Sequence, residues 1–141
     1  MVLQIKKLYQ EAKLPTRACE GDAGLDLYAM EDQVVAPGQR IIIGTGIAIR
    51  IPFGYAGLIW DKSGIASKSG MKVMGGVIDS GYRGEIKVVL TNLGENSYLV
   101  HIGDKIAQIL IQKIELPAVE EVEELPPTER NEQGFGSTGI C

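Results

Sequence analysis

The sequence contains only two cysteines and one histidine, which is little material for metal or disulfide chemistry. Cys19 and Cys141 are too few and too isolated for a disulfide framework or a zinc site, so we expect a reduced, cytoplasmic setting. His101 lies in a strand-like stretch before a turn, without a cluster of partners. This position favours a surface or interface residue over a catalyst.

Long apolar runs and an excess of basic residues are also missing. No stretch of the 141 residues reaches the ~20 apolar residues of a membrane span, and residues 1–7 lack the layout of a signal peptide. The formal net charge is -4, and Lys6, Lys7 and Lys13 are too few for a nucleic-acid patch. With 45% hydrophobic and 23% charged residues, the sequence is typical of a single soluble globular domain, and we expect no nucleic acid or membrane as partner.

Amphipathic helical periodicity is absent as well, and short β-type runs stand in its place. Strands are predicted at residues 2–8, 24–29, 33–36, 55–60, 97–101 and 106–114. Residues 41–49 predict one long strand, in which two glycines form a bend or bulge rather than a break. Residues 63–68 favour a short helix with Ser63 as its cap. Short strands with frequent glycine turns predict an all-β fold: a sandwich, jelly roll or barrel.

The chain is organised around residues 76–84, GVIDSGYRG, a glycine-rich loop between two β-branched runs. Gly75 and Gly76 remove two side chains in a row, which indicates that something comes close to the backbone. Asp79 offers a carboxylate that can take a proton from water, and Tyr82 offers a ring on which a flat ligand can lie. The loop is therefore a candidate small-molecule site. The alternative is an ordinary hairpin in which Asp and Gly only form the turn.

The composition changes from Leu116 onward to prolines and glutamates, which indicates an extended arm or a disordered tail. Residues 134–139 spell G-x-G-x-x-G, but a dinucleotide-binding motif must follow a strand and open a helix, and only two residues remain. The segment can still offer backbone N–H groups and two hydroxyls to phosphate oxygens. Phe135 is free to stack on a ligand, and Arg130 adds a bidentate charge.

Five separated stretches together resemble the motifs of the trimeric deoxyuridine triphosphatases, the dUTPase family. They are residues 23–29 (AGLDLYA), 61–66 (DKSGIA), 76–84 (GVIDSGYRG), 103–108 (GDKIAQ), and Arg130 with 134–139 (GFGSTG). They occur in the family's order and with about its spacing, over nearly the whole chain. The resemblance implies a β jelly-roll or distorted β-barrel subunit, residues 1–116, of a homotrimer. It also implies that an arm, residues 117–141, closes a neighbouring subunit's active site.

The resemblance further implies Mg²⁺-dependent hydrolysis of dUTP to dUMP and pyrophosphate. Asp79 is then the residue that orients and deprotonates the water that attacks the α-phosphorus. Tyr82 packs under the deoxyribose and leaves no room for a 2′-hydroxyl. The uracil edge is read, and cytosine rejected, by main-chain groups of a glycine-lined stretch: Val73, Gly75, Gly76, Val77 and Ile78. The reaction keeps uracil out of DNA and supplies dUMP for dTMP synthesis.

Other roles around the phosphates are also implied by the resemblance. Ser63, Gly64 and Gln108 contact the phosphate chain, and Lys62 balances its charge. Asp26 holds the water shell of a Mg²⁺ ion that the phosphates mainly bind.

The arm is implied to complete the site at both ends of the nucleotide. Arg130, Ser137 and Thr138 grip the γ-phosphate, with Gly136 beside them. Phe135 lies over the uracil ring.

Two positions depart from the commonest family pattern. Lys62 stands where an arginine is usual, so a bidentate phosphate contact becomes a point charge. Gly81 stands where a second acid is frequent. Because Asp79 is the expected water activator, the missing acid need not abolish activity.

Two other functions are compatible with the same fold. A dCTP deaminase, or its bifunctional form with dUTPase activity, shares the fold, but the family's catalytic glutamate would fall on Val89, which cannot carry protons. A non-catalytic dUTP-sensing protein of the same fold is expected to lack Asp79 or the arm motif, and this sequence has both.

Overall fold

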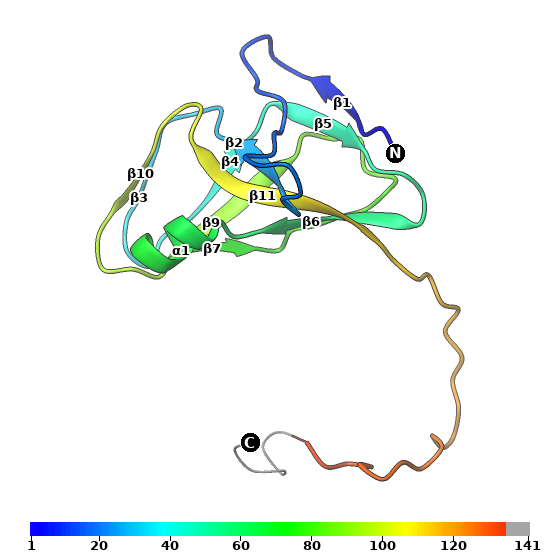
Figure 1. The fold of residues 1–141 in the computed structure, drawn as a ribbon. Coiled ribbons are helices and arrows are strands. Elements are labelled where there is room, and N and C mark those ends of the chain that lie inside the picture. Colours follow the sequence, from blue (N-terminus) through cyan, green and yellow to red (C-terminus); the bar gives the residue numbers. More distant parts are fainter. Residues whose placement is uncertain (135–141) are drawn as a thin grey trace.

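The computed structural model describes residues 1–134, and its regular secondary structure is almost entirely short strands (Figure 1). The strands are β1 (Gln4–Lys7), β2 (Leu25–Tyr28), β3 (Gln33–Val35), β4 (Arg40–Gly44), β5 (Ile47–Arg50), β6 (Tyr55–Trp60), β7 (Met71–Met74), β8 (Val77–Ile78), β9 (Lys87–Asn92), β10 (Tyr98–Val100) and β11 (Lys105–Lys113). The one helix of the described residues is α1 (Ser63–Ser69), between β6 and β7. The all-β prediction is confirmed. No helix in this range is long and apolar enough to cross a membrane.

The strands form four antiparallel sheets, with the orders β2-β11-β6-β8, β4-β9-β7, β1-β5 and β10-β3. Two of the pairings join the ends of the folded body: β2 lies beside β11, and β3 lies beside β10 (Figure 1). Over residues 1–134 the sheets do not close into a barrel. The strand β11 has a partner on each side, so it is the axis of the largest sheet.

Two local expectations were wrong. Residues 41–49 are not one bent strand, because β4 pairs with β9 while β5 pairs with β1 in another sheet. The chain changes sheet at Gly46, whose φ is +69° and whose absent Cβ would lie 2.8 Å from the Cβ of Ala12. The cap of α1 is Lys62 and not Ser63, and no side chain forms a capping hydrogen bond there.

The core is a continuous cluster of aliphatic side chains between the sheets. Its largest fully buried members are Leu27, Val35, Ile43, Ile47, Ile49, Ile51, Met71, Ile86, Val88, Leu90, Ile106 and Ile109. Asn92 is fully buried among them, and its amide donates to the main-chain oxygens of Val35 and Asn96, both at 2.8 Å. Its Oδ1 accepts a hydrogen bond from Gly94 N. This amide therefore ties the end of β9 to β3.

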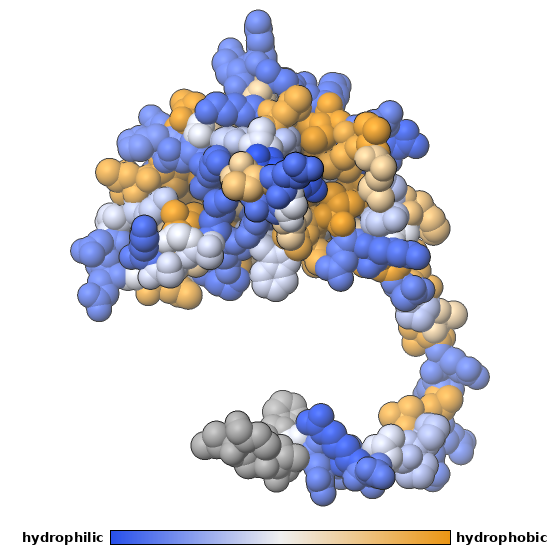
Figure 2. Space-filling view, viewed as in Figure 1, coloured by the Kyte–Doolittle hydropathy of each residue, from blue (hydrophilic) through white to orange (hydrophobic). Residues whose placement is uncertain are grey.

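The C-terminal arm leaves the body directly after β11. Ile114 N donates to Gly54 O at 3.0 Å, and every residue from 115 to 133 is exposed. In the space-filling view this segment stands clear of the body (Figure 2).

Candidate active site

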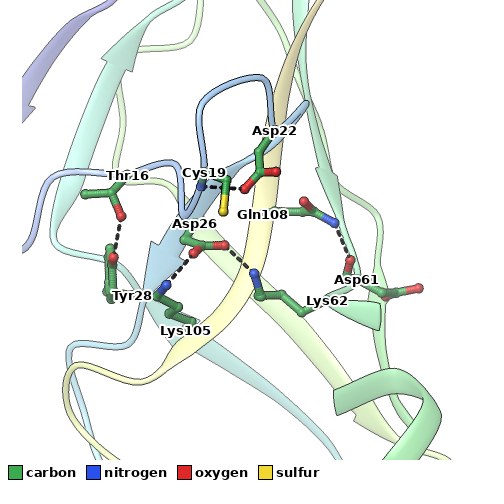
Figure 3. A network of polar contacts seen from close by, with 9 residues as sticks. All are labelled: Thr16, Cys19, Asp22, Asp26, Tyr28, Asp61, Lys62, Lys105 and Gln108. Atoms are coloured by element: carbon green, nitrogen blue, oxygen red, sulfur yellow. Dashed lines mark hydrogen bonds and ion pairs between the residues drawn. The ribbon is translucent and has the colours of Figure 1, made fainter. Parts of the chain in front are cut away.

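Asp26, on β2, is the buried carboxylate of the site, with 3% of its surface exposed. Lys62 donates a hydrogen bond to Oδ1, and Lys105 Nζ lies 2.8 Å from Oδ2 (Figure 3). This ion pair with Lys105 is the one polar contact of Oδ2 within residues 1–134. Burial raises the pKa of Asp26, but Lys105 and Lys62 together lower it by more, and the pKa ends below its ordinary value.

Gln108, on β11, lies directly beside this carboxylate. It pairs in register with Asp26 on one side and with Trp60 on the other. Its Nε2 donates to the main-chain oxygen of Asp61 at 2.8 Å (Figure 3). Gly24 makes room for this side chain, because a Cβ at that position would overlap the Gln108 amide. The sheet thus brings three stretches that are distant in sequence into contact.

The turn from β6 into α1 carries Asp61, Lys62, Ser63 and Gly64. Asp61 holds the turn against β7 by accepting a hydrogen bond from Val73 N. Ser63 and Gly64 open α1 and are exposed, and the first N–H groups of a helix have no partner within it. The turn can therefore offer an ammonium group, a hydroxyl and main-chain donors to an anion.

Gly75 and Gly76 connect β7 to β8 with φ values of +67° and +102°. The physical reason for a glycine differs between the two positions. A Cβ on Gly76 would lie 2.7 Å from the main-chain oxygen of Ile59, and Ile59 N donates to Gly76 O at 2.8 Å. A Cβ on Gly75 would meet no atom within 4 Å. The fold itself requires a glycine at position 76, whereas Gly75 leaves open space beside the backbone.

Asp79 and Tyr82 lie on a tight turn after β8. Tyr82 N donates to Asp79 O at 3.1 Å, and Arg83 donates to the oxygens of Ser80 and Tyr82 at 2.7 and 2.8 Å. The Tyr82 hydroxyl donates to Glu85 O at 3.0 Å, which holds the ring in place. Asp79 and Tyr82 are both exposed, and the Asp79 carboxylate has no protein partner within the described residues.

The expected site residues form separate groups in one chain. Asp26, Lys62 and Gln108 lie together, while no hydrogen bond or ion pair within residues 1–134 joins Asp79 or Tyr82 to them. Arg130 lies on the exposed arm. Four further expected residues lie outside the described range: Phe135, Gly136, Ser137 and Thr138.

Lys105 is the residue of the site that sequence reasoning missed. The stretch 103–108 was recognised, but only Gln108 was given a role. The signal was Asp26 itself, since a carboxylate between two apolar strand residues needs a cationic partner when it is buried. Which lysine supplies it depends on a register shift between Lys105 and Ala107 on β11, which no local pattern announces.

A family model described as dUTPase matches residues 10–139. The match spans the sheet that carries Asp26 and Gln108, the central loop and the arm. The chain belongs to the dUTPase family. It has the jelly-roll fold known for dUTPases, and its activity is that of a dUTP diphosphatase.

Relatives agree with the family assignment over nearly the full length. The deoxyuridine 5′-triphosphate nucleotidohydrolase of Corynebacterium glutamicum is 52% identical, over 97% of this chain and 94% of that protein. The enzyme of the same name from Paramecium bursaria Chlorella virus 1 is 49% identical, over 98% of each chain. These comparisons favour dUTP hydrolysis over dCTP deamination.

Solved structures agree as well. The dUTPase of Staphylococcus bacteriophage 80alpha, solved with dUpNHpp, has a TM-score of 0.93 and 33% identity, and the match covers 99% of each chain. A mutant dUTPase from phage phi11 of S. aureus has a TM-score of 0.83 and 30% identity, over 88% of this chain and 98% of that chain. That structure describes the coordination of a structural Mg(II) ion.

Proposed function

We propose that the chain hydrolyses dUTP to dUMP and pyrophosphate with Asp79 as the base that activates water. The carboxylate takes one proton from the water, whose oxygen forms a bond to the α-phosphorus. The bond from that phosphorus to the bridging oxygen breaks, and pyrophosphate leaves with the oxygen. The observation that supports this role is the exposed Asp79 carboxylate, which has no protein partner in the described range and follows the glycine link at positions 75 and 76.

The base is proposed to bind along the main chain from the end of β7 through the glycine link to β8. The groups concerned belong to Val73, Gly75, Gly76, Val77 and Ile78. Because β8 is the last strand of its sheet, one edge of its backbone has no strand partner among residues 1–134, and such an edge can pair with the uracil edge. Cytosine would present the wrong donors and acceptors to these fixed groups.

Tyr82 is proposed to lie under the deoxyribose and to exclude a 2′-hydroxyl. Its ring is fixed by the hydrogen bond to Glu85 O. Gly84 supports the same position, because a Cβ there would overlap the Tyr82 ring. A rigid ring can discriminate by shape, whereas a mobile ring would move aside.

The phosphate chain is proposed to lie against four groups on the β6–α1 turn and β11: Lys62, Ser63, Gly64 and Gln108. Lys62 and Lys105 bring two positive charges to the single carboxylate of Asp26, so this cluster carries a net positive charge. Such a charge favours the binding of a triphosphate.

A Mg²⁺ ion fits beside Asp26. The buried Oδ2 atom is contacted within residues 1–134 by Lys105 alone, and its further acceptor capacity can take a hydrogen bond from a water of the ion's shell. Mg²⁺ keeps several waters and prefers oxygen ligands, so one carboxylate with the substrate phosphates suits it. When bound, the ion would neutralise charge on the phosphates.

A homotrimer is proposed to assemble the separate groups into complete sites, with residues 117–141 of one chain reaching a neighbour. Trp60, Met74 and Val77 support this, since they are 53%, 41% and 69% exposed beside the central loop and would be buried by another copy. The exposed run from 115 to 133 supports a separate arm. A cytoplasmic setting stays a prediction.

The experiment is pyrophosphate release from dUTP, dCTP, dTTP and UTP with Mg²⁺, for the wild-type chain and Asp79→Asn. We expect cleavage of dUTP alone, lost in the variant, while the variant still binds dUpNHpp. Turnover of dCTP would contradict the proposed base selection. If the wild-type chain bound dUpNHpp but cleaved nothing, a dUTP-sensing protein would be the better conclusion.

A further inference from the structure

Within its described part, the arm has a turn at residues 128–131 that side-chain hydrogen bonds close. Thr128 N donates to Asn131 Oδ1, and Asn131 N donates to Thr128 Oγ1, both at 3.0 Å. Each side chain thus satisfies the backbone donor of the other residue. Asn131 has a φ of +42° and is the one non-glycine residue of the described range with a positive φ. Asparagine tolerates this region better than most residues. The turn is therefore closed by its own side chains, without help from the body.

The turn contains Arg130, and a second pair of contacts fixes its side chain. Arg130 Nε donates to Gln133 O at 2.8 Å, and Gln133 N donates to Arg130 O at 3.0 Å. A guanidinium group has five N–H donors, of which the Nε donor is thereby used. The four donors on the two terminal nitrogens are left for an anion. These are the donors that form a fork on a phosphate.

Residues 115–127 contain no comparable turn. Residues 115–127 form no helix or strand and are all exposed. Ordering a flexible segment on a ligand costs conformational entropy, which lowers affinity. A turn that exists before the nucleotide arrives removes this cost for the residues around Arg130.

We infer that Thr128 and Asn131 are positioning residues for dUTP hydrolysis, which hold the Arg130 guanidinium ready for the γ-phosphate. This inference rests on the γ-phosphate contact expected for Arg130. It adds two residues that lie outside the five family stretches. Because the reaction occurs at the α-phosphorus, a γ-phosphate contact is the same in the ground and transition states. Its loss raises KM and leaves kcat nearly unchanged.

The experiment measures binding of dUpNHpp and of dUMP to the full-length chain, with Mg²⁺, for Thr128→Ala, Asn131→Ala and Thr128→Ser. The alanine variants should bind dUpNHpp about fivefold more weakly, the factor that corresponds to one lost net hydrogen bond. Binding of dUMP should not change, because dUMP has no γ-phosphate. Thr128→Ser keeps the accepting hydroxyl oxygen and should bind dUpNHpp like the wild-type chain. Both changed positions, 128 and 131, are on the arm, so the body should fold normally.

Asn131→Gly separates the two properties of that residue. Glycine accepts the positive φ but provides no Oδ1. If the side-chain hydrogen bond matters, Asn131→Gly should therefore bind dUpNHpp nearly fivefold more weakly than the wild-type chain. Wild-type affinity in Asn131→Gly would overturn the role of the Asn131 side chain.

Arg130→Ala distinguishes failure of this inference from failure of the role on which it rests. If Arg130→Ala weakens dUpNHpp binding while Thr128→Ala and Asn131→Ala do not, the turn has no positioning role and the inference is overturned. If Arg130→Ala itself leaves dUpNHpp binding unchanged, the proposed γ-phosphate contact is wrong, and the inference falls with it. Equal weakening of dUMP and dUpNHpp by Thr128→Ala would also overturn it.

Discussion

Replacement of each of the two linked glycines by alanine should have different consequences, because the two positions face different surroundings. At Gly76 the added methyl group would lie 2.7 Å from the Ile59 oxygen, and the φ of +102° is outside the ordinary left-handed well. Strained backbone costs roughly 1–3 kcal/mol, and overpacking against main chain costs roughly the same again. We expect Gly76→Ala to lower the free energy of unfolding by about 3–5 kcal/mol.

Gly75→Ala should be much milder. Its φ of +67° lies in the left-handed well, and its Cβ would meet nothing within 4 Å. An alanine in this conformation costs about 1–2 kcal/mol. Gly54→Ala is the matched control, since Gly54 has a φ of +81°, equally open surroundings and a place in the turn between β5 and β6, away from the loop. Gly75→Ala and Gly54→Ala should therefore be equally stable.

The assay is thermal unfolding at one protein concentration, followed by steady-state kinetics with dUTP. A domain of this size shifts by roughly 3 °C per kcal/mol, so Gly76→Ala should melt several degrees below the other two variants. Gly75→Ala should raise KM where Gly54→Ala does not, because its methyl group occupies the proposed base-binding space. Equal melting temperatures for Gly75→Ala and Gly76→Ala would refute the assignment of a packing role to Gly76.

Three further outcomes follow from single residues. The pKa of Asp26 is lower in the folded chain than its value of ~3.9 in the unfolded chain, so the Asp26 carboxylate stabilises the fold. This stability is fully present above the unfolded pKa and is lost as pH falls through the folded pKa. Asp26→Asn should therefore remove this acid dependence from the free energy of unfolding measured in urea titrations. Asn92→Ala should cost about 3 kcal/mol of unfolding free energy in the same titrations, because a buried side chain loses three hydrogen bonds to main-chain groups. Tyr82→Ala should reduce the preference for dUTP over UTP, measured as the ratio of kcat/KM, from roughly a hundredfold to about tenfold. Tyr82→Phe keeps the ring but loses the hydrogen bond that fixes it, so its preference should lie between these two values.

Local sequence patterns predicted the strands whose own residue types are typical of a β-strand. The alternation around Asp26 predicted β2, and the apolar run 106–114 predicted β11. The observed burial does not alternate, since Asp26 and Leu27 are both buried, as are Ile106 and Ala107. The prediction of one bent strand over residues 41–49 was wrong because the local sequence does not show which strands pair. Its β-branched residues suit both β4 and β5, and the change of sheet at Gly46 depends on packing against Ala12, which is distant in sequence.

The candidate site was predictable as motifs but not as contacts. The sequence indicated Asp26, Lys62 and Gln108 separately, and only strand pairing shows that they touch. The two-residue strand β8 forms inside a stretch that looked like loop, because β6 offers it an edge. Thr128 and Asn131 could have been noticed, since a threonine and an asparagine three residues apart can cap each other's backbone donors.

The length of the arm determines whether chains that carry different mutations can restore each other's activity in a mixed trimer. The sixteen residues from Glu115 to Arg130 can span roughly 50 Å when extended, against a radius of gyration of about 13 Å for a body of this size. A chain can therefore carry its Arg130 across an entire neighbour. If arms act on neighbours, a mixed population of Asp79→Asn chains and arm-deleted chains would regain some complete sites, although neither chain works alone. The effect of a defective chain on activity would then depend on which other chains share its trimer, because each active site is shared between chains.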